Sequence, residues 1–447
     1  MKKFNSHLLS AGGFIVLMAL VLSRPPNLGA QFLGRPVVLV SSEPRGPGAA
    51  TTIQGGINMV APGGLVLVQP GTYGEALVIN KGLTLEALGR ESGPVIVAPP
   101  VPAPPEVLAS IAVQIDTNDP VTIRGITVQY TGGSGIRGDG PVDVTIERTV
   151  LLADNPPVGG PTALVSVRRN NASETGKRAR LVVRQSVLDG TITCLTWSDA
   201  CSTVEPDTPP FPQIFGIVVG EDIDAVLEGN VIRRTGGACI FVRVADNLGG
   251  HTDVDILDND LDECYPLRRA GAIFVGPARG NDPSESLPVR ATGQVNIMGN
   301  TIRNSSGSCR TTTGILYMVF GGRIERNRIE GVVQTCSSET LRTGPAGIGL
   351  GSRLQSSFYP LVDVKVRFND IVGNAQAGLR VAPNMSAPPI DANCNWWGDV
   401  SGPSGSGSGT GDAVVVEGNA AVPAFVPFAT APIAKSEGRG PCQRNVP

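Results

Sequence analysis

One short pattern of hydrophobic and polar positions recurs along this chain: apolar, any, apolar, two further residues, asparagine, any, apolar. Its clearest copies centre on Asn230, Asn259, Asn300, Asn327 and Asn369. On each side of the asparagine the apolar residues follow the two-residue period of a β-strand. Each copy therefore predicts two short strands joined by a sharp bend, with the apolar side chains of both strands on the inside.

Three earlier copies keep the apolar frame but have Ile126, Thr149 or Ser186 at the centre. From Ile126 to Asn395, successive centres are 23 to 44 residues apart, so the shortest unit is one coil and longer units carry loops. A single coil cannot bury its own apolar face, and the coils must therefore stack. We predict an all-β fold, a single-stranded right-handed parallel β-helix (solenoid), over residues 51–400. Asparagine tolerates a left-handed backbone, so we expect it to form the bend itself, and its stacked amides to form a ladder.

The two ends of the chain show different patterns. Ile53, Ile57 and Val60 share one helical face after an N-capping threonine, which predicts a short N-terminal capping helix. Lys2 and Lys3 precede an apolar run of about a dozen residues, too short to span a membrane, and small residues follow it. We therefore expect a signal peptide at 1–30, a linker at 31–50, and a Gly/Ser-rich turn with a C-terminal capping tail at 401–447.

Composition narrows the functional classes. The chain has 447 residues, 41% of them hydrophobic, and a net charge of −3 without a basic stripe, which argues against a nucleic-acid partner. All eight cysteines follow the signal segment, and their even number suits a secreted protein with paired thiols. We expect no membrane span after signal cleavage. Cys309 and Cys336 each lie nine residues after their asparagine, which predicts a disulfide between neighbouring coils. We also predict that Cys194–Cys201 closes one loop, Cys239–Cys264 joins two coils and Cys394–Cys442 fastens the tail.

Two segments resemble known β-helix proteins. Residues 51–88, with Ala61-Pro-Gly-Gly-Leu-Val-Leu-Val-Gln-Pro-Gly-Thr-Tyr-Gly-Glu75, resemble the opening of pectin-lyase-like proteins, including pectin methylesterases. Asn395-Trp-Trp-Gly398 and the Gly/Ser-rich stretch after it resemble the closing segment of secreted bacterial β-helix repeat proteins. The resemblance covers about 51–428. It implies the fold and an extracellular or cell-surface location, but fold does not select a function.

The catalytic signatures of these relatives are missing from the sequence. No Gln-Asp or Asp-Phe-Ile-Phe-Gly element follows Glu75, and the segment 271–276 lacks the acid of the esterase motif. The only histidines are His7 and His251, so the Gly-His-Gly of polygalacturonases and the Asp-Pro-His-Asp of alginate epimerases are both absent. His251, beside two glycines, is expected to be an ordinary surface residue.

Charged residues recur at fixed offsets from the repeat centre. Three residues after it, the charge alternates in sign on successive coils, which predicts an outward salt-bridge ladder or part of a polyanion-binding face; the residues are Asp189, Arg233, Asp262, Arg303 and Glu330. Asp224 and Asp253, with Asp255 two residues further on, are expected to stack on neighbouring coils. Clustered carboxylates suit Ca²⁺, so these three are the candidate metal ligands, with a solvated strand face as the alternative.

The predicted function follows from these features. Trp397 is expected to point inward and Trp396 outward, where it covers the last coil or stacks on a sugar. We predict an extracellular or surface scaffold, glycan-binding or adhesin-like, with a polysaccharide or cell-surface glycan as partner and a face formed by the loops 189–216, 264–292 and 331–361. The alternative is a lyase, hydrolase or esterase acting on an acidic polysaccharide, with the three aspartates as metal ligands or acids and Arg233 or Arg243 as base or clamp.

Overall fold

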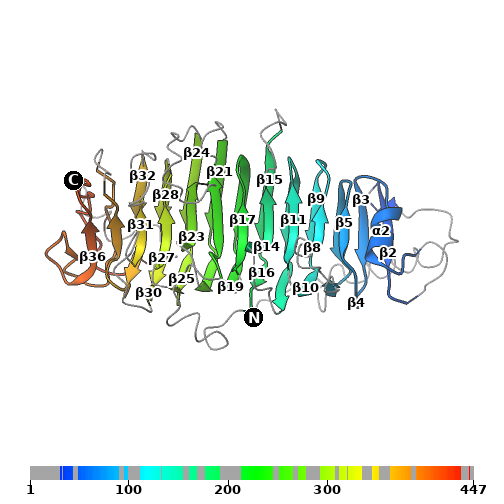
Figure 1. The fold of residues 1–447 in the computed structure, drawn as a ribbon, viewed down its shortest axis with the longest axis horizontal. Helices are drawn as coiled ribbons and strands as arrows, with labels where there is room; N and C mark the ends of the chain where they lie inside the picture. Colours follow the sequence, from blue (N-terminus) through cyan, green and yellow to red (C-terminus); the bar gives the residue numbers. More distant parts are fainter. Residues whose placement is uncertain are drawn as a thin grey trace, which may run out of the picture.

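The computed structural model describes most of the chain from residue 31 onward. The described residues are 31–32, 34–43, 49–89, 95–98, 111–131, 133–154, 161–168, 177–191, 213–244, 251–264, 270–277, 292–307, 312–319, 321–334, 345–351, 363–383, 389–433 and 442. They form an elongated right-handed parallel β-helix whose strands lie side by side along the long axis (Figure 1). The predicted signal peptide at 1–30 lies outside the described residues.

Three long sheets run the length of the solenoid. Sheet I has twelve strands. They are β1 (Gln31–Phe32), β2 (Arg35–Val40), β3 (Gly64–Val68), β6 (Leu83–Ala87), β9 (Val121–Arg124), β12 (Asp143–Glu147), β15 (Ala179–Arg184), β18 (Ile223–Glu228), β21 (His251–Leu257), β24 (Thr292–Met298), β28 (Gly322–Glu325) and β32 (Val364–Arg367).

Sheet II has ten strands. They are β4 (Thr72–Tyr73), β7 (Val95–Ala98), β10 (Thr127–Thr131), β13 (Val150–Asp154), β16 (Val187–Asp189), β19 (Val231–Thr235), β22 (Asp260–Cys264), β25 (Thr301–Arg303), β29 (Arg328–Glu330) and β33 (Asp370–Val372).

Sheet III again has twelve strands. They are β5 (Leu77–Ile79), β8 (Ile111–Ile115), β11 (Ser134–Asp139), β14 (Pro161–Arg168), β17 (Gln213–Val219), β20 (Ile240–Val244), β23 (Ala270–Pro277), β27 (Thr312–Tyr317), β31 (Ala346–Leu350), β34 (Leu379–Val381), β35 (Pro403–Gly405) and β36 (Gly411–Val416). A further short pair joins β26 (Ser306–Gly307) to β30 (Val333–Gln334).

Each coil supplies one strand to each sheet in turn, as β18, β19 and β20 do. The apolar positions of the repeat stack in line from coil to coil and face the interior, as the sequence predicts. One such line in sheet I is Val144, Leu181, Ala225, Val254 and Val295, each at most 4% exposed. The core is therefore one continuous apolar column enclosed by three sheets.

The asparagine ladder lies at the bend between sheets I and II. The backbone N–H and the Nδ2 of Asn259 both donate to Oδ1 of Asn300, at 2.9 Å each, and Asn259 Nδ2 also donates to the Leu227 carbonyl. The same bonds recur at every asparagine from 230 to 369, and Ser186 continues them toward Thr149 with its hydroxyl. The predicted ladder is confirmed.

The bend residue is not the asparagine, contrary to the expectation from sequence. The left-handed backbone falls on the residue before each ladder position, for example Asp258 at φ 52° and Phe368 at φ 56°. The physical reason is that the asparagine must turn its amide inward to reach the next coil, so its neighbour makes the turn. A non-glycine residue in this conformation is tolerated because the ladder fixes the backbone around it.

The N-terminal end is capped as predicted. Helix α2 (Ile53–Met59) buries Ile53 and Ile57, and the Thr52 side chain accepts the Gly55 N–H. The Glu75 carboxylate accepts two further N–H groups of the first helical turn. The segment 31–50 is not simply a linker, because β2 lies within it and pairs in parallel with β3. This strand extends sheet I by one coil under α2.

The C-terminal end also extends further than expected. The boundary predicted at residue 400 is passed by β36, which pairs in parallel with β34 and continues sheet III. Trp397 is fully buried and closes the core, and Trp396 is partly exposed, so the orientation predicted for both is confirmed.

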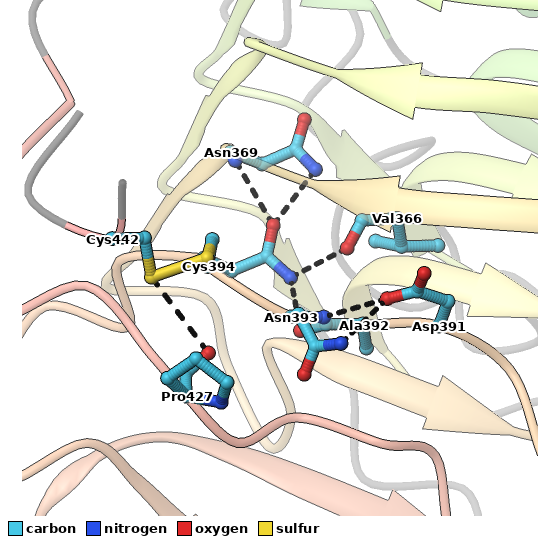
Figure 2. The surroundings of a disulfide bond; sticks show 9 residues. Val366, Asn369, Asp391, Ala392, Asn393, Cys394, Pro427 and Cys442 are labelled. Carbon is cyan, nitrogen blue, oxygen red and sulfur yellow. Dashed lines mark hydrogen bonds between the residues drawn. A yellow bond between two sulfur atoms is a disulfide. The ribbon is translucent and has the colours of Figure 1, made fainter. Parts of the chain in front are cut away.

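Two of the four predicted disulfides lie within the described residues, and both are present. Cys239 and Cys264 have Cα atoms 5.6 Å apart, and Cys394 and Cys442 have Cα atoms 5.5 Å apart. The second disulfide anchors the tail beside the ladder amide of Asn369 (Figure 2). Asn369 Nδ2 donates to Oδ1 of Asn395, the residue that follows Cys394. Cys194, Cys201, Cys309 and Cys336 lie outside the described residues.

Candidate functional site

The three predicted metal ligands lie on the outer face of sheet I. Asp224 in β18 stands directly opposite Asp253 in β21, as expected, and Asp255 follows two residues later on the same face. Each carboxylate has its own donor. Asp224 pairs with Arg178, Asp253 accepts from His251 Nε2 at 2.8 Å, and Asp255 accepts from Asn296 Nδ2 at 2.8 Å. These partners offset the repulsion between the stacked aspartates.

The described part of the chain contains no group of three or more His, Cys, Asp or Glu side chains that could hold a metal ion. A Ca²⁺ ion at Asp253 would have to displace the His251 contact. Binding of Ca²⁺ stays a prediction, which a calorimetric titration of the wild type and the Asp253→Asn variant would test.

Arg233 lies on sheet II, in the predicted charge ladder. The five ladder residues stand opposite one another in register, with Arg233–Asp189 at 2.9 Å and Arg303–Asp262 at 3.4 Å. Two details differ from the expectation. Glu330 pairs with Arg328 of its own strand, and the Asp189 side chain is buried rather than outward, at 1% exposed.

Asp189 is a structural anion. Burial raises its pKa, but hydrogen bonds from Arg234 and from the Thr191 N–H, together with the charges of Arg234 and Arg233, outweigh burial and hold the pKa below its usual value. Two guanidinium groups therefore neutralise one buried carboxylate, an arrangement that ties β16 to β19.

Trp396 lies at the end of sheet II, where it forms an isolated bridge with Asp370. Burial raises the pKa of Asp370, whose carboxylate accepts the Ile433 N–H at 2.7 Å and so holds the tail over this face. Stacking of a sugar on Trp396 stays a prediction. Asp224 is on sheet I, Trp396 on sheet II and Arg243 on sheet III, so the predicted site residues do not share one face.

Arg243 belongs to a group of arginines on the outer face of sheet III. Arg168 at the end of β14, Gly220 and Arg243 of β20 follow one another on successive coils. Arg137 of β11 pairs with Asp139 at 2.8 Å. Burial lowers the pKa of Arg168, the positive charges of Arg137 and Arg243 lower it further, and Asp139 opposes them. Burial is thus the main cause of the lowered pKa, and the charges of the two neighbouring arginines add to it.

Phenylalanine rings continue this face toward the C-terminus. Phe241 stacks on Phe274 with ring centroids 4.8 Å apart, and it lies 5.6 Å from Phe215. The guanidinium carbon of Arg243 is 6.0 Å from the Phe241 ring. Gly276 leaves room for the Phe274 ring, since a Cβ there would be 2.5 Å from a ring carbon. We call these residues the arginine–phenylalanine face: Arg137, Arg168, Arg243, Phe215, Phe241 and Phe274.

Sequence analysis selected only Arg243 of this face. The other members cannot be found by counting, because the segments between sheets II and III differ in length and no constant offset from the ladder leads to them.

A second row of charged residues does have a constant offset and could have been recognised from the sequence. Two residues before the centre, Glu86, Arg124, Glu147, Arg184 and Glu228 alternate in sign down sheet I, with Arg124–Glu147 at 2.9 Å and Arg184–Glu228 at 3.1 Å.

Comparisons with known proteins bear on the fold alone. A scan against models of protein families finds no match, and neither does a search of curated proteins. Among solved structures the chain is similar to the Dettilon tailspike protein, with 13% identity, a TM-score of 0.43, and coverage of 81% of this chain and 63% of the tailspike. It is also similar to pectate lyase Pel9A, with 14% identity, a TM-score of 0.41 and coverage of 90% and 82%. For the A-module of the Azotobacter vinelandii mannuronan C-5 epimerase AlgE6 the identity is 16%, the TM-score 0.35 and the coverage 82% and 93%.

Proposed function

We propose that this protein is an extracellular or cell-surface scaffold that binds an acidic glycan on the arginine–phenylalanine face of sheet III. The observation that carries the proposal is the juxtaposition of stacked aromatic rings with crowded arginines on adjoining coils. Burial is the main cause of the lowered pKa of Arg168, and an anionic ligand would oppose the repulsion from Arg137 and Arg243 that adds to it.

The two halves of the face suit the two chemical characters of an acidic sugar. Guanidinium groups bind carboxylate or sulfate through paired hydrogen bonds, while the apolar face of a sugar ring packs on an aromatic side chain. Because neighbouring coils are about 4.8 Å apart, groups on successive strands present themselves at regular intervals to a linear polymer. Phe241 and Arg243 are on the same strand, so one sugar unit would contact both.

One observation supports an extracellular location. The disulfides Cys239–Cys264 and Cys394–Cys442 suit an oxidising compartment. Among the described residues, no helix has the length and apolar character needed to cross a membrane.

The test is binding of the full chain to polygalacturonate and alginate, with neutral dextran as comparison, at low and high salt. Arg168→Gln and Arg243→Gln remove one charge each, and each is expected to weaken binding about tenfold or more, since a charge-assisted hydrogen bond contributes about 1.5–3 kcal/mol. Phe241→Ala is expected to weaken it by a smaller factor. Arg124→Gln on sheet I is the matched control and should bind like the wild type.

Equal affinity for dextran and the polyanions, or equal effects of Arg168→Gln and Arg124→Gln, would refute the proposal. The loops predicted to form the binding face, 189–216, 264–292 and 331–361, lie mostly outside the described residues. The enzyme alternative stays a prediction: its aspartates on sheet I do not share a face with Arg243. Product formation in the same incubations would test it.

A further inference from the structure

His251, expected to be an unremarkable surface residue, is held at both ring nitrogens. Nδ1 is 2.9 Å from Thr292 Oγ1, and Nε2 is 2.8 Å from Asp253 Oδ2. The three residues lie on two adjacent strands of sheet I, because His251 stands directly opposite Thr292 and Asp253 follows two residues later in β21. In Figure 1, β21 and β24 run side by side near the middle of the solenoid.

The backbone around the histidine fixes its position. The His251 N–H donates to Asp222 Oδ1 at 3.1 Å, and its carbonyl accepts from Arg178 at 3.2 Å. The second oxygen of Asp253 accepts the Gln294 N–H at 3.1 Å. Both the imidazole and its carboxylate partner are therefore held by hydrogen bonds beyond those they make with each other.

The chemistry of these contacts assigns the protons. An ionised carboxylate only accepts, so Nε2 carries the hydrogen that is donated to Asp253. In neutral imidazole this leaves the lone pair on Nδ1, which accepts the hydroxyl hydrogen of Thr292. A hydroxyl donating to a base that is oriented by an acid is the arrangement of an activated nucleophile. The ring nitrogens are used in the opposite order from the serine protease triad, but the roles are the same.

We propose that Thr292, His251 and Asp253 form an acyl-transfer site that cleaves exposed O-acyl esters. Thr292 Oγ1 attacks the acyl carbon while His251 Nδ1 takes its proton, and that proton passes to the leaving alkoxide as the ester bond breaks. Water then attacks the acyl-threonine, giving its proton to Nδ1, and the proton returns to Thr292 as the acid leaves.

The exposure of the site indicates the kind of substrate. Thr292 is exposed, and the side chains of His251 and Asp253 are 42% and 52% exposed. An open face of this kind suits an ester that projects from a large molecule, such as an acetyl group on a polysaccharide. The site is on sheet I and the arginine–phenylalanine face is on sheet III, so each proposal stands or fails without the other.

The experiment uses p-nitrophenyl acetate as the probe with the full chain. Release of p-nitrophenolate reports the first step, and peptide mass analysis after rapid quenching reports an acetyl group on Thr292. Thr292→Ala is a surface change expected to lower release about 100-fold and to abolish the adduct. Thr292→Ser should retain the adduct, and Asp253→Asn should slow its formation roughly tenfold or more. Thr122→Ala, an outward threonine elsewhere on sheet I, should behave like the wild type.

Two outcomes would overturn the proposal. One is release by Thr292→Ala at the wild-type rate, which would mean that the imidazole acts alone. The other is the absence of an acetyl group on Thr292 in both the wild type and the serine variant.

Discussion

Asn300 provides the most direct test of how the ladder stabilises the solenoid. Its Oδ1 accepts both the N–H and the Nδ2 of Asn259, and its own Nδ2 donates to the Ile256 carbonyl and to Asn327 Oδ1. Replacement by alanine removes these four bonds and a further one from Nδ2 to the Met298 carbonyl, at a position that is 0% exposed. The Asn259 N–H then remains buried without an acceptor.

The expected cost follows from these bonds. A buried donor that loses its partner costs about 1–3 kcal/mol, and the remaining bonds contribute about 1 kcal/mol each. We therefore expect Asn300→Ala to lower the free energy of unfolding by about 4–6 kcal/mol. Asn300→Ser should cost less, because Ser186 already serves as an acceptor in the native ladder.

Urea unfolding and hydrogen exchange would measure this effect. Because each coil contacts only its neighbours, loss of amide protection should concentrate around Asn259 and Asn327 rather than spread along the chain. Asn296→Ala is the matched control, since Asn296 lies on the outer face of β24, just before the bend at Asn300, and the change removes one hydrogen bond to Asp255. It should cost below about 1 kcal/mol.

The reasoning fails if Asn300→Ala and Asn296→Ala destabilise the protein equally. It also fails if protection is lost evenly over all coils, because the ladder would then not act locally.

Three further predictions concern other parts of the fold. Replacing both Cys239 and Cys264 by serine removes a cross-link between residues 25 apart in sequence. In urea unfolding, the double variant should have a free energy of unfolding about 3.5 kcal/mol below that of the oxidised wild type. The pKa of Asp189 is lowered below an unfolded value of about 3.9, so its stabilisation is complete above about pH 4 and is lost as pH falls further. Asp189→Asn should thus flatten the fall of the urea midpoint between about pH 4 and 2, and an unchanged slope would contradict this. Trp397→Ala should cost about 3–5 kcal/mol, as a fully buried aromatic does, and a similar cost for the partly exposed Trp396→Ala would argue against the core role.

The parts of the fold that depend on a fixed offset from the ladder were predictable from sequence. The inward line of apolar residues and the opposition of Asp224 and Asp253 both follow from counting residues from the repeat centre. Counting succeeds because the backbone from sheet I through the bend to sheet II has the same length on every coil.

The positions of residues on sheet III could not be predicted, because the constant backbone length ends at sheet II. The segments leading to sheet III vary in length, so Arg168 and Arg243 could not be aligned although they lie two coils apart. Residue preference alone places the bend at the asparagine, whereas the inward position of its amide moves the left-handed residue one position earlier. The sequence does not single out His251, because no second histidine or cysteine stands at ligand spacing from it, whereas its partners are a threonine and an aspartate.

The ladder also makes the distance between neighbouring coils in space independent of the number of residues between them in sequence. Consecutive asparagines are 26 to 42 residues apart in sequence, yet each Nδ2 lies 2.9–3.0 Å from the next Oδ1. Insertions and deletions outside the strands thus leave the core register unchanged, whereas a partial coil would interrupt three sheets at once. The molecule can therefore vary its surface loops freely during evolution or engineering, but it can change its length only by whole coils.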